Sequence, residues 1–487
     1  MRESRIVAMF AVALFGNAIP TPVSANLYGT DLNLSAHPIT GGMAGAGYTL
    51  ALEPSVALFG NPASLTQMRG IQYNLGATYF HFFGNRHRQD FAGLSNTSTS
   101  ANTDYLIPVS AATFELVEDL VIGFGVEVAT GAGVDYRSDP ITLLGTPTDT
   151  TVGGNPVPGT TVPALAQVIT FNGNLGLAYE IADMLSIGAA FTLGFGFLQV
   201  GTAGNTTGLD VASGGLVDNF GGTTSTVQDF GFGASVGLNL NPVDVFLVSV
   251  AYKSSVKYKF DNVISTTVGG PQVYQRLELQ QPQEVVFGVA LRDIAPELSL
   301  AFDVVWKNWE NADAYKDVFK NQWLILVGGQ YVVAEILSLR LGYSYSTPVL
   351  RGTPNNAIDG LTGLGTIPFG DAGEPFSSAL MSIVQTGLTP VVWQHNITVG
   401  GGVQVTDKVS LDAYFSFSIP NEVSRSPAEL SDFLGAPVVY TSDMKLALWV
   451  GAGVRVAIGA EPEEPAEPSQ SEVEIEADIT EVEIEVE

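Results

Sequence analysis

The sequence predicts an all-β fold, a fourteen-stranded antiparallel transmembrane β-barrel with an N-terminal hatch (plug) in its lumen. Three observations predict it. Between residues 71 and 458, apolar and polar residues alternate with a period of two over long segments, as in strands with one apolar face. The connections between these segments are alternately short and long. Finally, 14% of the residues are charged, against about 25% in typical soluble proteins, yet no run of 18 apolar residues predicts a transmembrane helix.

Residues 1–25 are expected to be an export signal peptide. Arg2 and Arg5 precede the apolar run IVAMFAVALFG, and the small residues VSA end the segment, which is the order of a signal peptide. A buried N-terminal helix is the alternative, but Pro20 and Pro22 would break it where cleavage would fall. The chain has no cysteine, so no disulfide framework is available.

Residues 26–70 are expected to fold as a compact plug. They contain few charges, many glycines and alanines, and no sustained alternation. Within them, ALFGNPASLTQM (57–68) predicts a short helix, because Asn61 can cap it and Pro62 suits its first turn. Fourteen strands enclose a lumen too wide for side chains alone to fill, so a plug is needed to prevent leakage.

Residues 71–458 are expected to form the barrel. In DVFLVSVAYKSSVKYKF (244–260), read as one strand, apolar residues share one face and lysines share the other. Six short turns and seven long connections give fourteen strands with both ends on the short-turn side. Lipid offers no hydrogen-bond partner, so a sheet survives there only if it closes, and this loop pattern is typical of outer-membrane barrels. A soluble sandwich or propeller would expose apolar faces in strand after strand.

Residues 459–487 are expected to be an acidic periplasmic tail. Residues 461–487 carry twelve acids and no base, out of a formal net charge of −29. The composition is typical of disorder, although the alternation of Glu with Val or Ile in SEVEIEADITEVEIEVE would also suit addition as a strand to a partner. The acidic balance argues against nucleic-acid binding.

Three segments resemble one known family. GGMAGAGYTLALEPSVALFGNPASL, with Asn61, Pro62 and Ala63, resembles the hatch of the FadL/TodX (OMPP1) outer-membrane transporters for hydrophobic compounds. Residues 281–310 and 321–349 resemble two later hairpins of the same family. The resemblance covers nearly all of the chain between the signal peptide and residue 458.

The resemblance implies passive transport of hydrophobic small molecules, such as long-chain fatty acids or aromatic hydrocarbons, across the outer membrane of a Gram-negative bacterium. In the family, ligand leaves sideways through a gap at a kinked third strand. The third strand here is LVIGFGVEVATGAGVDY, where Gly131 and Gly133 would permit such a kink. Glycines on a crowded barrel wall are the alternative interpretation.

Candidate ligand contacts fall into two groups. Apolar hatch residues would form a pocket, with packing against the wall as the alternative: Met43, Leu50, Leu52, Leu58 and Phe59. Basic residues expected to face the lumen would meet a carboxylate, with pairing to Asp303 or Asp412 as the alternative: Lys253, Lys257 and Arg340. The sequence does not choose between a fatty acid and an aromatic hydrocarbon.

Catalysis has little support in the sequence. The four histidines, His37, His81, His87 and His395, show no metal-ligand spacing and suggest no nucleophilic triad. We therefore expect no enzyme, no metal and no cofactor. The expected partners are hydrophobic small molecules, outer-membrane lipid and lipopolysaccharide, and the outer-membrane assembly machinery, with the protein as a monomer. A general porin for polar solutes and an adhesive or structural barrel remain alternative functions.

Overall fold

The computed structural model describes residues 29–144, 150–152, 155–157, 160–182, 184–202, 207–210, 215–218, 222–223, 226–266, 273–295, 297–334, 336–352, 384–388, 393–419, 421–428, 431–432 and 435–459. The predicted signal peptide and the acidic tail beyond Gly459 lie outside the described residues. Among the described residues, no helix combines the length and the apolarity that crossing a bilayer requires.

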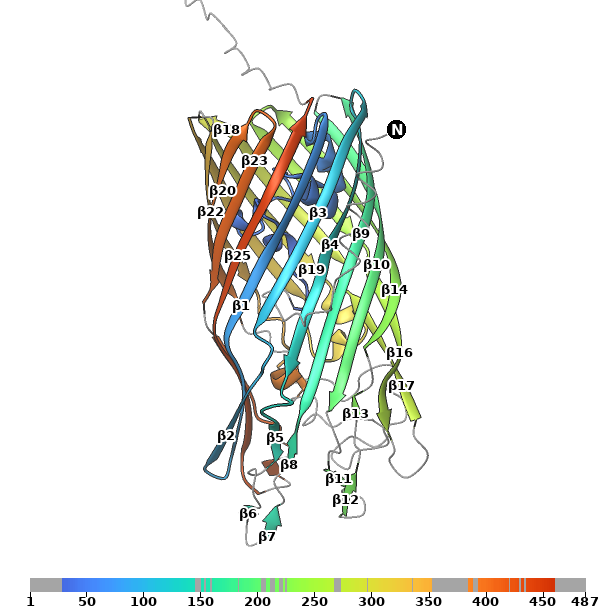
Figure 1. The fold of residues 1–487 in the computed structure, drawn as a ribbon, viewed down its shortest axis with the longest axis vertical. Coiled ribbons are helices and arrows are strands. Elements are labelled where there is room, and N and C mark those ends of the chain that lie inside the picture. Colours follow the sequence, from blue (N-terminus) through green and yellow to red (C-terminus); the bar gives the residue numbers. More distant parts are fainter. Residues whose placement is uncertain are drawn as a thin grey trace, which may run out of the picture.

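Fourteen antiparallel strands close into a barrel, as the sequence predicts (Figure 1). The first strand, β1, pairs with β3 on one side and with the last strand, β25, on the other. Three strands are interrupted and carry two labels, β15/β16, β17/β18 and β23/β24. The bounds are β1 Ile71–Phe91, β3 Asp104–Val117, β4 Leu120–Asp135, β9 Ala164–Ala182, β10 Leu185–Thr202, β14 Val227–Val243, β15 Phe246–Lys253, β16 Val256–Thr266, β17 Val273–Gln281, β18 Glu284–Ala295, β19 Leu298–Lys307, β20 Gln322–Val333, β21 Leu337–Ser346, β22 His395–Thr406, β23 Val409–Ser418, β24 Asn421–Arg425 and β25 Val438–Ile458.

Side chains along the strands alternate between exposed and buried positions, which confirms the predicted period of two. On β21, Leu339 and Leu341 are exposed while Arg340 between them is buried. On β23, Leu411 is exposed and Asp412 is buried. An apolar outer face and a polar inner face are what a barrel in lipid requires.

One predicted strand differs from the structure. Residues 244–260 form two strands, β15 and β16, separated by Ser254–Ser255. The break reverses the alternation, because the inner position after Lys253 is Val256, three residues on instead of two or four. Lys257, expected to face the lumen, therefore lies on the face of β16 opposite to the buried Val256.

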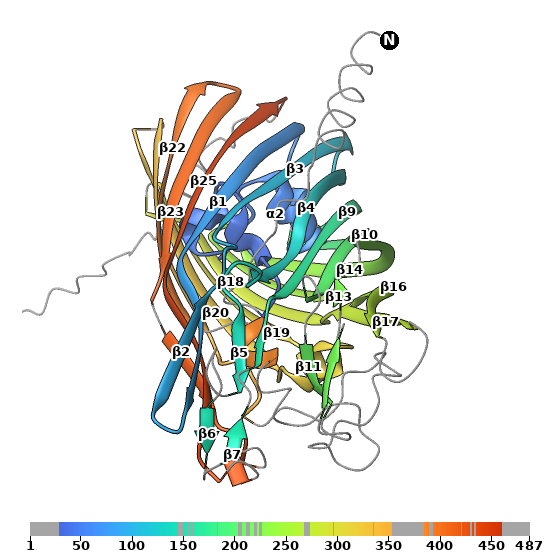
Figure 2. The same cartoon turned by 60° about the horizontal axis from the view of Figure 1, so that its bottom comes forward.

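The two ends of the barrel differ (Figure 1). At one end, six connections of two or three residues join neighbouring strands, as expected. At the other end, β1 and β25 continue beyond the barrel and pair there with β2 and β24 (Figure 2). The additional short strands are β2 Leu94–Thr99, β5 Ile141–Leu144, β6 Thr150–Val152, β7 Asn155–Val157, β8 Thr160–Val162, β11 Thr207–Asp210, β12 Gly215–Asp218 and β13 Gly222–Thr223.

Residues 29–70, called the hatch below, lie inside the barrel towards the short-turn end (Figures 1 and 2). Glycines let the backbones of hatch and wall approach closely: a Cβ on Gly188 of β10 would lie 2.4 Å from Pro62, and one on Gly342 of β21 would lie 2.2 Å from Met43. The hatch helices are η1 Asn33–Ala36, η2 Thr40–Met43, α2 Pro54–Phe59 and η3 Pro62–Gln67, and the loop helices are η4 Trp309–Asn311, η5 Tyr315–Asp317 and η6 Val384–Leu388.

Candidate functional site

The wall of the barrel is incomplete between its second and third strands, β3 and β4. Their pairing runs from the turn at Val117–Leu120 to the pair Val109–Glu127 and ends there. Beyond that point β3 still pairs with β1, as far as Asp104, and β4 still pairs with β9. Past the pair Val109–Glu127, β3 and β4 are therefore not paired with each other. The gap ends at the last residue of β4, where Ala101 N–H donates to the carbonyl of Asp135 at 2.8 Å.

The first residues of the hatch occupy part of this gap. Leu32 N–H donates to the carbonyl of Ala129 on β4 at 2.9 Å, and Gly131 N–H donates to the carbonyl of Thr30 at 2.9 Å. The ladder between β4 and β9 is irregular between Val128 and Thr130. Gly131 follows this irregularity directly, and Gly133 lies two residues further on. The gap edge of β4 is thus bonded to the hatch at the place where the glycines were predicted to permit a kink.

A buried ionic cluster holds the same hatch residues to the opposite wall. Lys307 Nζ, on β19, donates to Asp31 at 2.9 Å and also to Glu284 of β18. Lys253 of β15 lies 3.3 Å from Glu284 and 5.3 Å from the ring centroid of Tyr48. Lys307 is fully buried, so the pairing of each charge is needed to offset its desolvation.

A cavity of about 60 Å³ lies beside this cluster, between the hatch and the wall. Phe59 and Leu34 of the hatch form its apolar side. Asn172 and Asn174 of β9 belong to its polar side, and the gap-lining Ala129 of β4 also contacts it. The cavity therefore adjoins both the ionic cluster and the incomplete seam.

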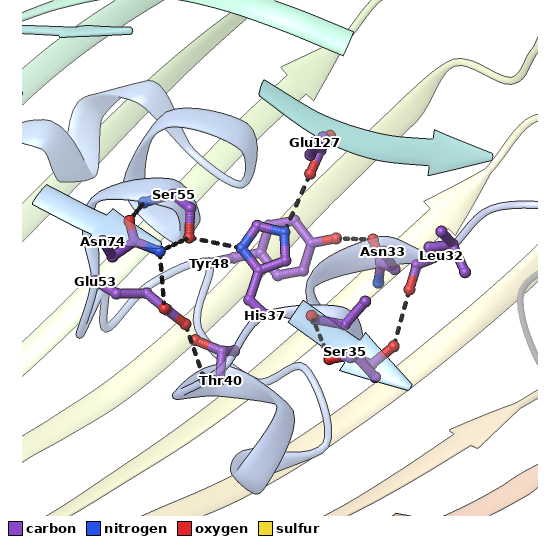
Figure 3. Close-up of polar contacts among 12 residues, drawn as sticks. Leu32, Asn33, Ser35, His37, Thr40, Tyr48, Glu53, Ser55, Asn74 and Glu127 are labelled. Carbon is purple, nitrogen blue, oxygen red and sulfur yellow. Dashed lines mark hydrogen bonds and ion pairs between the residues drawn. The ribbon is translucent and has the colours of Figure 1, made fainter. Parts of the chain in front are cut away.

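Polar contacts inside the hatch fix its shape (Figure 3). His37 Nδ1 lies 2.8 Å from Ser55 Oγ, and its Nε2 lies 3.1 Å from Glu127 of β4. The carboxylate of Glu53 accepts hydrogen bonds from the backbone N–H groups of Ile39 and Thr40 at 3.1 and 3.0 Å. Among the described residues, no three acidic or histidine side chains are arranged to hold a metal ion.

The hatch residues singled out from the sequence are all covered by other residues, but they do not share one pocket. Phe59 lines the cavity described above. Met43 packs against Gly342, and Leu58 packs against Gly123 and Gly176 of the wall. Leu50 is buried in the hatch core and Leu52 is half-buried against it.

The predicted turn after Asn61 forms. Its side chain accepts a hydrogen bond from Ala63 N–H at 3.1 Å at the start of η3, and Pro62 occupies the first helical position. The Asn61 amide also hydrogen-bonds with Asn239 of β14 at 2.7 Å, so the motif joins the hatch to the wall. A Cβ on Gly237 would lie 1.8 Å from the Asn61 side chain, and this contact explains a glycine on the facing strand.

The three predicted basic residues all have acidic neighbours. Arg340 donates to Asp412 at 2.8 Å, which was the alternative expected from the sequence. Lys253 pairs with Glu284, and Lys257 pairs with Asp313 at 2.7 Å and with another acid on β17. Their role towards a carboxylate ligand stays a prediction.

Sequence reasoning missed the ionic cluster. Lys307 lies four residues after Asp303 on one strand, so the alternation that placed Asp303 inside also placed Lys307 inside. The inward position of Lys307 could therefore have been predicted from the sequence. Asp31 lies in a segment without periodicity, and nothing local indicates that it meets a lysine 276 residues away.

A larger cavity of about 240 Å³ lies at the long-loop end. Trp393, Val349, Leu350 and Val423 form its apolar part, and Arg425 lies at its edge. Trp393 stacks on Phe82 at 5.2 Å and is buried. The cavity is therefore a partly apolar recess at the long-loop end of the barrel.

Comparisons with known proteins agree with this architecture. A family model described as outer membrane protein transport protein (OMPP1/FadL/TodX) matches residues 29–358. No curated protein sequence matches the chain.

Several solved structures share the fold at low identity. The crystal structure of the P. putida toluene transporter TodX is similar with a TM-score of 0.60 and 16% identity, over 88% of this chain and 99% of that one. A Pseudomonas aeruginosa FadL homologue gives a TM-score of 0.59 at 13% identity, over 90% and 99% of the two chains. The Ralstonia pickettii toluene transporter TbuX gives 0.57 at 15% identity, over 88% and 99%.

Proposed function

Because the chain belongs to the OMPP1/FadL/TodX family of outer membrane transport proteins, we propose that it gives hydrophobic small molecules a passive route across the outer membrane of a Gram-negative bacterium. As a member of a family of transport proteins, it is a transporter and not an enzyme. Toluene is the solute that the names of two similar proteins give, and long-chain fatty acids are the second class of solute that the family resemblance implies. The long-loop end would face outwards, as in other outer-membrane barrels.

The observation that carries the proposal is the seam between β3 and β4. The hatch fills the lumen towards the short-turn end, so a direct path to the periplasm is obstructed. Unpaired strand edges facing lipid are costly, yet here pairing stops at Val109–Glu127. A gap of this kind would let an apolar solute pass from the lumen into the bilayer without crossing the hatch.

The route would run from the outer cavity near Trp393 into the lumen, past Phe59, and out beside Gly131 and Gly133. The hatch segment at Thr30–Leu32 would have to move, because it bonds to β4 in the gap. Two backbone hydrogen bonds and one from the Thr130 hydroxyl to Asp31 hold it to β4 there. Its release would break these bonds and the Asp31–Lys307 pair, but none of the bonds between the strands of the barrel.

A disulfide lock tests the route. Asp31 and Thr130 face each other as a β-bridge with their side chains 3.1 Å apart, a geometry that suits a disulfide. The chain has no cysteine, so Asp31→Cys with Thr130→Cys forms one defined bridge. We expect uptake of toluene or oleate by expressing cells to fall to background when the bridge is oxidised and to recover with reductant.

The matched control places a bridge across the closed seam. Ala77 of β1 and Ala452 of β25 are also paired opposite each other, and Ala77→Cys with Ala452→Cys should leave uptake unchanged in both redox states. Undiminished uptake through an oxidised Asp31–Thr130 bridge would show that solute does not leave through this gap.

A further inference from the structure

The cavity between the hatch and β9 is small and mostly polar. Its volume of about 60 Å³ is well below the roughly 150 Å³ of an apolar cavity that holds benzene, whereas one water occupies about 30 Å³. It has room for the polar head group of a solute, while the apolar part would lie elsewhere in the lumen.

Three amide atoms of residues lining this cavity have no hydrogen-bond partner among the described residues. The Oδ1 atoms of Asn172 and Asn174 are buried and make no hydrogen bond to any residue that the structure describes. Asn174 is 8% exposed. From the hatch side, Asn33 Nδ2 is also buried and unbonded within the described residues. Buried polar atoms without partners are rare in proteins, so an unbonded set lining one cavity indicates a ligand or water.

The charges around the cavity do not favour an anion. Three acids, Asp31, Glu127 and Glu284, and two bases, Lys253 and Lys307, line it. Lys307 donates to two of the acids, and Lys253 pairs with Glu284. A carboxylate entering here would meet no unpaired cation and an excess of negative charge, at short range and in a low-dielectric site.

We propose that the cavity selects hydrophobic solutes with a neutral hydroxyl head group. The inference rests on the proposed transport function and names the substrate class. A hydroxyl both donates and accepts, so it can donate its one O–H to the carbonyl oxygen of Asn172 or Asn174 and accept from the Asn33 amide at the same time. A pure hydrocarbon would leave all three unbonded, and a carboxylate can only accept.

A matched series of head groups tests the proposal. Benzyl alcohol, benzoate and toluene share one ring and differ in the group attached. Equilibrium dialysis of the ¹⁴C-labelled compounds against the protein in lipid nanodiscs, with empty nanodiscs subtracted, should show benzyl alcohol binding about tenfold more tightly than either of the others. This is the ratio expected when one to two net hydrogen bonds are gained.

Variants assign the preference to the cavity. Asn174→Leu and Asn172→Leu keep a similar volume and remove the amide, and each should cut the preference for benzyl alcohol over toluene by about threefold or more. Asn85→Leu is the control, because Asn85 of β1 is also buried and unbonded among the described residues but does not line the cavity. Heat-modifiable mobility on gels shows whether each variant forms the barrel.

A second variant tests the charge argument. Asp31→Asn removes one acid from the cavity, and binding of benzoate should increase several-fold while that of toluene is unchanged. Benzoate binding most tightly to the native protein, or an unchanged preference in both Asn→Leu variants, would overturn the proposal and leave the cavity to water. Failure of the proposed transport function would give a different result. Cells with the native protein would then take up none of the three compounds faster than cells with the oxidised variant Asp31→Cys with Thr130→Cys.

Discussion

The two seams that β1 and β4 make with their neighbours show how one barrel can be both closed and open. Between β1 and β25 the register is maintained from Ile71–Ile458 to Phe91–Val438, and only the pair of Gly84 with Lys445 is missing from it. Between β3 and β4 it covers only the stretch from the short turn to Val109–Glu127. The first seam extends past the barrel, and the second stops within it.

The difference lies in what satisfies the backbone. Along β1 and β25, each strand supplies the other's hydrogen bonds, and the result is independent of the hatch. At the end of the β3–β4 ladder, β3 carries Pro108, which has no N–H to donate, and β4 bonds to Thr30 and Leu32 instead. A seam completed by a hatch segment can be opened by moving that segment, while a seam completed by a strand cannot.

The largest effect is expected from breaking the closed seam. Val450 of β25 pairs with Tyr79 on one side and Phe415 on the other, so Val450→Pro removes a ladder hydrogen bond whichever way its N–H points. In lipid no water replaces that bond, and the cost of several kcal/mol for each unsatisfied backbone group should prevent assembly. Heat-modifiable mobility and trypsin resistance in outer-membrane fractions measure it, and Val450→Ala, which keeps the N–H, should assemble. A folded Val450→Pro barrel would mean that this seam is not what closes the wall.

The next effect concerns the hatch side of the open seam. Lys307→Met leaves Asp31 and Glu284 without their shared cation, and breaking a buried pair costs about 3–5 kcal/mol. We expect hydrogen exchange at Leu32 and Gly131, whose N–H groups hold the hatch to β4, to accelerate by at least a hundredfold.

The control for Lys307→Met is the replacement by methionine of a basic residue on the closed seam. Arg86 of β1 pairs with Asp443 of β25, but both side chains are partly exposed, 32% and 21%, and such pairs contribute only about 0–1 kcal/mol. Arg86→Met should leave exchange in β1 and β25 nearly unchanged. Equal acceleration in the two variants would mean that the ionic cluster does not hold the gap segment in place.

The closed seam between β1 and β25 could be predicted from the sequence, whereas little of the open seam between β3 and β4 could. Alternation along a strand indicates which face meets lipid. The number of strands and the inward positions of Arg340 and Asp412 could therefore be predicted from it. Breaks in alternation are not visible in the same way: Ser254–Ser255 shifts the phase and moves Lys257 to the other face, although both serines fit an uninterrupted strand.

The site was less accessible from the sequence, because it is made by contacts between distant segments. Gly131 and Gly133 were predicted to permit a kink in β4, and the irregularity of its ladder lies just before them, between Val128 and Thr130; their role in a lateral exit stays a prediction. The hatch residue that meets β4 there, Asp31, belongs to a segment with neither period nor motif. Packing against the wall and not local propensity determines its position, so only the three-dimensional arrangement reveals it.

A smaller effect is expected where the hatch packs on the wall away from the gap. A Cβ on Gly188 of β10 would lie 2.4 Å from backbone atoms of Pro62, whereas a Cβ on Gly401 of β22 would meet only Ser338 O, at 3.4 Å. Gly188→Ala should therefore destabilise the hatch by about 1–3 kcal/mol through overpacking, and Gly401→Ala should be close to neutral. Urea-dependent proteolysis of the hatch measures the difference, and equal susceptibility would show that the hatch does not rest on β10.

The smallest effect concerns the part of the closed seam that extends beyond the barrel, where His87 of β1 is buried. Burial lowers the pKa of His87 to about 4, from 6.5, because desolvation disfavours the imidazolium. The ring stacks on Tyr440 of β25 at 5.9 Å, and its Nε2 lies 3.3 Å from Thr386.

Between these two pKa values the unfolded extension binds a proton that the folded one does not. The contribution of His87 to stability is therefore complete above pH 6.5 and falls as the pH falls towards 4, by about 1.4 kcal/mol per pH unit. Hydrogen exchange at Arg86–Phe91, corrected for its intrinsic pH dependence, should accelerate roughly fivefold from about pH 6.5 to 5.5, while the β1 amides inside the barrel stay unchanged. His87→Gln should abolish this pH dependence. If the pH dependence persisted in that variant, another group would cause it, and the buried neutral imidazole of His87 would not stabilise the part of the closed seam beyond the barrel.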